Sequence, residues 1–119
     1  MGERLTMMIK RGDIFWMALD IQSDSRIIHG KRPVVVVSNN TANRFSPIVS
    51  VIPVTRQIKK TLPTHVMVVG YGLPDPSTIL TEQVLSIDKS NLLEKIGTLT
   101  GTTEMLKIDH CLCIQLGVA

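Results

Sequence analysis

The sequence predicts a mainly β (α+β) fold, in which a small β-barrel or strongly curved sheet is followed by one C-terminal helix. Short aliphatic runs recur along the chain between turns rich in Gly, Pro and polar residues, which is typical of such β folds. Helical spacing of apolar residues is found near the C-terminus. The 119 residues suffice for one domain, and because only 3% are aromatic, we expect Val, Ile, Leu and Met to supply most of the core.

The strands are predicted from seven aliphatic segments. The strongest prediction rests on four successive valines at 34–37, which are typical of a strand buried on both faces. Gly12 and Asp13 are expected to form a turn or bulge near the start of the first strand. Pro53 must lie where no ladder hydrogen bond is needed. The predicted strands are residues 9–19, 32–39, 48–55, 65–69, 77–81, 84–87 and 94–100.

The segments between these strands are polar and predict loops. Residues 20–31 are aperiodic and are expected to form a mobile loop. Residues 41–47 predict a turn, and residues 56–61 (Arg-Gln-Ile-Lys-Lys-Thr) a basic loop. Residues 70–76, with two glycines and two prolines, predict a turn region, and residues 88–90 are expected to begin a short helical turn.

Residues 102–116 predict the helix. Glu104 would lie in its first turn, where the helix dipole favours a negative charge. The apolar side chains that recur at helical spacing are Met105, Ile108, Leu112 and Leu116. Cys111 and Cys113 would point to different faces of this helix, so we expect two reduced thiols rather than a disulfide. No cluster of His, Cys, Asp or Glu has metal-ligand spacing, so no metal is expected. No glycine-rich phosphate loop of the recognised nucleotide-binding patterns occurs either, and no other cofactor is expected.

The charge is unevenly distributed along the chain. Residues 1–60 carry ten Lys or Arg against four Asp or Glu, whereas residues 61–119 carry three against six. This asymmetry predicts a basic face that attracts nucleic acid or an acidic protein partner, the alternative being a merely solvated surface. The chain has no 18-residue apolar run and residues 1–8 do not resemble a secretory signal, so we expect a cytoplasmic protein without a membrane span.

Arg32, just before the valine run, is the first candidate for chemistry. A permanently charged guanidinium at the edge of a core needs a partner, which could be Asp13 or Asp20 of the same chain, or an external anion. Thr55 ends the 48–55 strand. If that strand neighbours the valine strand, Arg32 and Thr55 could lie close together and bind a phosphate.

The sequence also predicts the environment of three further residues. His65, at a strand start, is expected to be a hydrogen-bonded structural residue. Gln83 could read the edge of a nucleobase or could be a solvated polar residue. Trp16, in the first strand, is expected in the core or at an interface.

Taken together, residues 9–118 resemble the MazF/PemK family of toxin endoribonucleases, because several short motifs occur in the family's order. These are Arg11-Gly12-Asp13-Ile14-Phe15-Trp16, the stretch from Gly30-Lys31-Arg32-Pro33 through the valines to Ser38-Asn39, Asn43-Arg44-Phe45-Ser46-Pro47, Pro53-Val54-Thr55, Leu62-Pro63-Thr64-His65-Val66, Glu82-Gln83 and Ile87-Asp88-Lys89. The resemblance implies an SH3-like curved barrel, CcdB/MazF-like, with residues 9–119 as the toxin domain and residues 1–8 as a flexible N-terminal extension. It also implies a homodimer.

The implied activity is sequence-specific, ribosome-independent and metal-independent cleavage of single-stranded mRNA. The 2′-hydroxyl would attack the phosphate to give a 2′,3′-cyclic phosphate and a 5′-hydroxyl, and translation would be arrested. The implied partner is an acidic, MazE-like antitoxin whose tail blocks the RNA site.

The resemblance assigns the catalytic roles to Arg32 and Thr55. The residues expected to contact RNA are Arg11, Lys59 and Lys60 at phosphates, and Ser38, Asn39, Ser77 and Gln83 at unstacked bases. The chain departs from many relatives in lacking a Glu in the loop before Arg32. Asp24 is the nearest acid there, and His29 is a candidate substitute as general base.

Two alternatives remain open at the level of sequence. One is a non-catalytic, CcdB-like toxin that poisons a protein target such as DNA gyrase through a dimer surface and the C-terminal helix. The other is a protein that holds RNA without cutting it. The presence of both Arg32 and Thr55 favours the nuclease.

Overall fold

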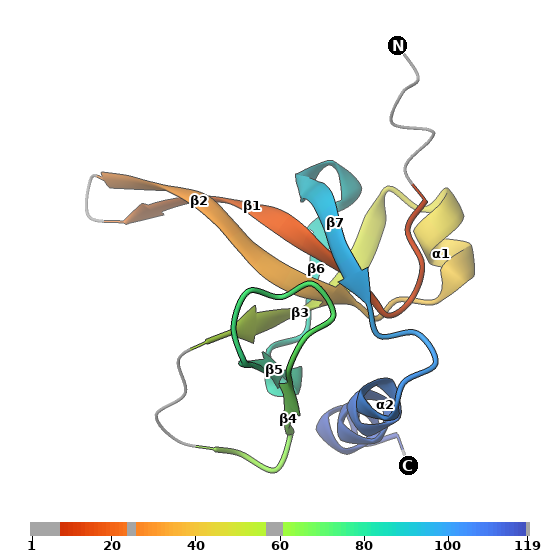
Figure 1. The fold of residues 1–119 in the computed structure, drawn as a ribbon. Coiled ribbons are helices and arrows are strands. Elements are labelled where there is room, and N and C mark those ends of the chain that lie inside the picture. Colours follow the sequence, from red (N-terminus) through yellow and green to blue (C-terminus); the bar gives the residue numbers. More distant parts are fainter. Residues whose placement is uncertain (1–7, 24–25, 57–60, 119) are drawn as a thin grey trace.

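The fold is given by a computed structural model that describes residues 8–23, 26–56 and 61–118. In this part of the chain, seven strands form an antiparallel sheet in the order β4-β5-β3-β2-β1-β7, and β6 pairs with β3 beside this path (Figure 1). The strands are β1 (Asp13–Ser23), β2 (Arg26–Val36), β3 (Ile48–Thr55), β4 (His65–Val68), β5 (Ser77–Leu80), β6 (Leu85–Asp88) and β7 (Leu92–Thr98). The helices are α1 (Asn40–Phe45), α2 (Thr103–Leu116) and the single 3₁₀ turns η2 (Thr81–Gln83) and η3 (Lys89–Asn91). The predicted fold class is confirmed, although among the described strands β4, β6 and β7 each pair on one side only, and the sheet is not a closed barrel.

The four valines contribute alternately to two hydrophobic cores, because successive side chains of a strand point to opposite faces. Val35 and Val37 pack in the core beneath α2, together with residues of β3, β4 and β5. Val34 and Val36 pack in a second core on the other face, with residues of β1, β3, β6 and β7. Burial of the valine strand on both faces is therefore confirmed.

α2 confirms the predicted C-terminal helix. Thr102 caps its start by accepting a hydrogen bond from the Met105 backbone N–H, and Gly117 ends it in the left-handed conformation at φ 68°. Its buried residues are Met105, Ile108 and Cys111. Both cysteines are unpaired thiols. No helix of the described residues is long and apolar enough to cross a lipid bilayer.

The predicted mobile loop over residues 20–31 is wrong for the residues that the structure describes. β1 continues to Ser23 and β2 begins at Arg26, and the two strands project together from the rest of the sheet (Figure 1). Their backbone groups satisfy each other in a ladder whatever the polarity of the side chains, so polar composition was a poor guide here. Residues 24 and 25 lie outside the described residues.

The predicted turn at 41–47 is also wrong, because residues 40–45 form α1. Asn39 caps this helix by accepting a hydrogen bond from the Ala42 backbone N–H at 2.8 Å. Asn43, which is buried, donates to the Ser38 carbonyl and to Asn40 Oδ1. A helix of six residues is too short to show apolar periodicity, and the capping asparagine was its only strong sequence signal.

The remaining elements follow the prediction with shifted ends. The first strand starts at Asp13 rather than residue 9, after a turn in which Gly12 has φ 95°. The last strand is displaced from 94–100 to Leu92–Thr98. The helical turn expected at 88–90 is η3, where Asp88 accepts a hydrogen bond from the Ser90 backbone N–H.

Candidate functional site

Strand register aligns Arg32 with Thr55. β2 and β3 are antiparallel, with Val34 opposite Pro53 and Val36 opposite Val51. Partners in an antiparallel pair change by equal and opposite steps, so two residues beyond the Val34–Pro53 pair this register places Arg32 across from Thr55. By the two-residue alternation of strands, both side chains belong to the face that carries Val34.

This alignment extends across five strands. Met17 of β1 is the partner of Arg32, Thr78 of β5 is the partner of Thr55, and Met67 of β4 is the partner of Thr78. We call these residues, Met17, Arg32, Thr55, Thr78 and Met67, the transverse row. Their side chains share one face of the curved sheet, and α2 packs on the other face.

Arg32 is half-buried in this row. Within the described part of the chain, no carboxylate forms an ion pair with its guanidinium. Asp13, one of its two predicted internal partners, instead accepts from the Lys10 backbone N–H and lies 3.5 Å from Lys95 Nζ. The side chain of Asp20, the other predicted partner, lies outside the described structure. The geometry of the described residues therefore favours the external-anion reading of Arg32.

Arg11 lies in a different environment. Its Nη1 is 2.7 Å from Asp109 Oδ1 on α2, at an angle that makes the contact an ion pair without a hydrogen bond to that oxygen. Its Nε donates to the Val37 carbonyl at 2.8 Å. These interactions tie the start of the sheet to α2, and they engage the Nη1 and Nε atoms of Arg11 within the protein.

The other residues expected to contact bases are dispersed. Ser38 and Asn39 support α1, because the Ser38 hydroxyl donates to Asn43 Oδ1 and Asn39 is the helix cap. Ser77 is buried, donates to the Asp75 carbonyl, and shares the face of Ile79 beneath α2 rather than that of the transverse row.

Gln83 is exposed on η2 and is available to a ligand. Four of the expected functional groups cannot be placed in the site. Lys59, Lys60 and Asp24 lie outside the described residues, as does the side chain of His29. The β2–β3 register, continued two residues beyond its last pair, thus sets Arg32 and Thr55 on one face of the sheet. The structure also adds Thr78 and Met67, which the sequence did not single out because only the β3–β5 and β4–β5 registers reveal them.

A buried polar cluster holds η2 in place. His65 Nδ1 accepts a hydrogen bond from the Leu62 backbone N–H at 3.1 Å, so Nε2 carries the proton that points to Glu82 Oε2, also at 3.1 Å. Thr64 donates to the other carboxylate oxygen. Burial acts to raise the pKa of Glu82, but hydrogen bonds from its own backbone N–H, His65 and Thr64 outweigh burial and lower that pKa. The predicted structural role of His65 is confirmed.

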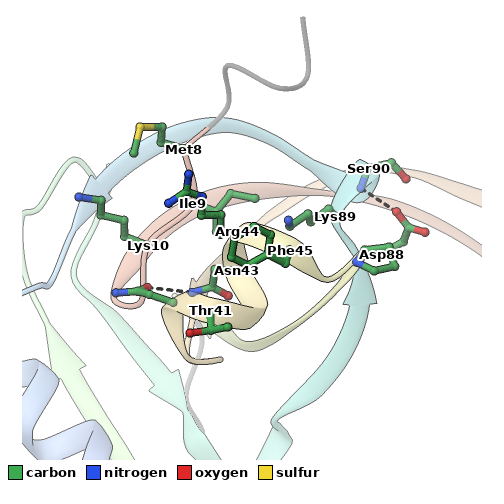
Figure 2. Close-up of a pocket in the computed structure, with 12 residues that line it drawn as sticks. Met8, Ile9, Lys10, Thr41, Asn43, Arg44, Phe45, Asp88, Lys89 and Ser90 are labelled. Carbon is green, nitrogen blue, oxygen red and sulfur yellow. Dashed lines mark hydrogen bonds between the residues drawn. The ribbon is translucent and has the colours of Figure 1, made fainter. Parts of the chain in front are cut away.

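A separate groove of about 1050 Å³ lies beside α1, and Figure 2 shows the side chains that line it. Neither Arg32 nor Thr55 is among them. Its cations are Lys10, Arg44 and Lys89, and the Phe45 ring is 73% exposed with the Arg44 guanidinium 5.2 Å from its centre. In the described part of the chain, no three His, Cys, Asp or Glu side chains are grouped closely enough to hold a metal ion.

Comparison with known proteins adds a family to this geometry. Residues 10–116 match the family model described as the PemK-like, MazF-like toxin of type II toxin–antitoxin systems. The chain is 39% identical over 115 residues to Endoribonuclease MazF of Staphylococcus epidermidis, which covers 93% of each protein.

Solved structures agree with the fold. An endoribonuclease from a mycobacterial species, in complex with its cognate antitoxin, has a TM-score of 0.74 at 25% identity and covers 93% of this chain and 97% of that one. MazF in a MazE–MazF complex from Deinococcus radiodurans has a TM-score of 0.79 at 20% identity, covering 95% and 99%. The family match over nearly the whole sequence, together with a close relative of equal extent, shows that this chain belongs to the PemK-like, MazF-like toxin family of type II toxin–antitoxin systems.

Proposed function

We propose that this chain is an endoribonuclease toxin that cleaves single-stranded mRNA in a sequence-specific and ribosome-independent manner, with Arg32 and Thr55 as its catalytic residues. One observation carries the proposal: the β2–β3 register aligns these two side chains on one face, and no described carboxylate pairs with Arg32. Family membership and the endoribonuclease relative support the reaction class and do not support the gyrase-poison alternative.

The protein need not supply a nucleophile for this reaction, because the RNA carries its own in the 2′-hydroxyl. The 2′-oxygen forms a bond to phosphorus, the bond from phosphorus to the 5′-oxygen breaks, and the products are a 2′,3′-cyclic phosphate and a 5′-hydroxyl. A base takes the proton of the 2′-hydroxyl, and the leaving 5′-oxygen gains a proton. The enzyme must align these atoms and stabilise the charge that develops on the phosphate.

Arg32 supplies that stabilisation in the proposal. A guanidinium stays protonated in proteins and presents a planar set of donors that matches two non-bridging phosphate oxygens. Thr55 would hydrogen-bond the phosphate or the 2′-oxygen from the neighbouring strand. Asp24 and His29 are the two candidates for the general base.

The partners follow from the same site. We propose that an acidic, MazE-like antitoxin occupies the RNA site with its tail, because acidic side chains compete with phosphates for the same guanidinium. A relative solved with its cognate antitoxin supports this pairing. We also propose that the toxin acts as a homodimer in the cytoplasm, where mRNA is translated.

Incubation of the purified protein with a defined long RNA tests the proposal, with the 5′ ends of the fragments sequenced. We expect cuts at a recurring short motif without added metal or ribosomes, and no cut where the nucleotide at that position lacks its 2′-hydroxyl. Lys107→Ala serves as a control variant: it removes a positive charge from the exposed side of α2 and should cut the RNA as the wild type does. Intact RNA after incubation with folded wild-type protein would contradict the proposal.

A further inference from the structure

We infer that Met67 is a specificity-determining residue, which contacts a nucleobase beside the scissile phosphate through its exposed side chain. The inference rests on the proposed function, since it names the part of the substrate that the Arg32–Thr55 site would recognise. Met67 belongs to no motif that the sequence analysis singled out, and it enters the site through strand pairing alone.

The position of Met67 follows from two registers. Thr55 pairs with Thr78, and Thr78 pairs with Met67, so Met67 lies two strands from Thr55 along the transverse row. Neighbouring strands are about 4.8 Å apart, which puts the Met67 backbone about 10 Å from that of Thr55. A side chain as long as methionine can cover much of that interval, so a base next to a phosphate held by Arg32 and Thr55 is within its reach.

The side chain is oriented by a buried hydroxyl. Thr78 is only 2% exposed, and its Oγ1 donates to Met67 Sδ at 3.1 Å. This hydrogen bond holds the thioether over the transverse row, while 61% of Met67 remains exposed. Val66 and Val68, on either side of it in β4, pack in the core beneath α2, so strand alternation confines Met67 to the face of the row.

The exposed surface around Met67 is apolar, whereas Arg32, Thr55 and Thr78 are the polar members of the row. Val69, two residues farther along, is 68% exposed. β4 is an edge strand of the sheet, so a nucleotide can approach from the open side. Unstacked bases of single-stranded RNA need an apolar surface to replace the stacking they have lost.

Aromatic side chains usually provide such a surface, and the transverse row contains none. The chain has four aromatic residues, of which Phe15 is buried and the others lie in β1, α1 and the 70–76 turn. Methionine is an adaptable substitute, since its flexible, polarisable thioether packs against flat rings of different shape. The polar Arg32–Thr55 pair beside an apolar methionine is therefore suited to a nucleotide, with its phosphate on one side and its base on the other.

The test is the base preference of the Met67→Ala variant. Cleavage rates are measured on short RNAs that contain the wild-type cut site and differ in one base on either side of the cut. We expect kcat/KM on the preferred RNA to fall about tenfold, as for the loss of one stacked base. We also expect the preference at one flanking position to flatten, and Met67→Leu, which keeps the apolar volume, to retain most of both.

Two further variants sharpen the result. Leu106→Ala removes an equally exposed aliphatic side chain from α2 and should change neither rate nor preference. Thr78→Val removes the hydrogen bond to the thioether and should relax the preference more than it lowers the rate. Because Met67 is largely exposed, Met67→Ala should melt as the wild type does, which separates a contact with RNA from a loss of fold.

The outcomes distinguish this inference from the proposed function. If the wild type cuts RNA and Met67→Ala cuts with the same rates and the same preference at every flanking position, the inference is overturned and the nuclease stands. If the wild type does not cut RNA at all, the proposed function fails and the inference fails with it.

Discussion

Arg11, which lies just before β1, and Arg32, which lies within β2, have opposite environments. Arg11 is tied to Asp109 of α2 and to the Val37 carbonyl, on the face that α2 covers. Arg32 lies on the other face, half-buried, beside hydroxyls and methionines rather than carboxylates of the described chain. The residue type is the same and both belong to family-like motifs, so the difference between a paired and an unpaired guanidinium comes from the carboxylates that the described part of the fold places nearby.

Among the substitutions that test this comparison, those of Arg32 are expected to have the largest effect. We expect Arg32→Ala to lower kcat by about 10²- to 10³-fold, the range for removing one preorganised donor to a developing anion. Arg32→Lys should recover little of this, because an ammonium cannot make the paired contacts of a planar guanidinium. Single-turnover cleavage of a defined RNA gives the rate. A thermal melt should show that both variants remain folded, and an Arg32→Ala variant with the wild-type rate would mean that the arginine is misassigned.

Thr55 is expected to show the next largest effect. Thr55→Val preserves the shape of the side chain on β3 and removes the hydroxyl, so kcat should fall by about tenfold to 10²-fold with little change in RNA affinity. Thr55→Ser, which restores the hydroxyl, should recover most of the rate. Binding of a substrate whose cleavage-site 2′-hydroxyl is absent separates the two quantities. Equal loss of rate in the Val and Ser variants would show that the hydroxyl is not what matters.

The sequence pointed to both members of the proposed catalytic pair, Arg32 and Thr55, but could not show how they lie relative to each other. The valine run and the charge before it are local signals, because a strand that is buried on both faces has apolar residues at consecutive positions. The alignment of Arg32 with Thr55 depends on the β2–β3 register, which joins residues far apart in the chain. For the same reason, the sequence did not reveal that Met67 pairs with Thr78. The register of this pair is set by the turn between the two strands, which contains two glycines and two prolines.

Composition was also a weak guide to some contacts and elements of this fold. The sequence did not reveal the ion-pair partner of Arg11, because Asp109 is 98 residues away in sequence and reaches it only through the packing of α2. The β1–β2 extension was read as a loop from its polar residues, although backbone pairing alone can hold such a ribbon. Charge alone cannot tell a ligand-binding arginine from a structural one before the fold is known.

Arg11→Ala should therefore affect stability rather than chemistry. It removes the Asp109 ion pair and the hydrogen bond to Val37, and we expect the free energy of unfolding to fall by about 2 kcal/mol. The cleavage rate of the folded fraction should be unchanged. Urea titration at several protein concentrations measures the stability, because a dimer would make it concentration-dependent. A fall in kcat comparable to that of Arg32→Ala would erase the distinction between the two arginines.

The smallest effect is expected at Glu82, on the structural side of the comparison. Because the pKa of Glu82 is lowered in the folded protein, its ionised form contributes stability that is present above its ordinary pKa of 4.5 and is lost as the pH falls through the lower folded value. Glu82→Gln should cost about 1 kcal/mol at pH 7, since one amide oxygen cannot serve both the His65 and Thr64 donors as the carboxylate does. The variant should also lose part of the decline in stability that the wild type shows as the pH falls below 4.5. Urea titrations across this range, with the wild type alongside, measure both quantities. If the stability of the two proteins changed with pH in the same way, His65 would not be holding the carboxylate in its ionised form. Packing alone would then position η2, which carries Gln83.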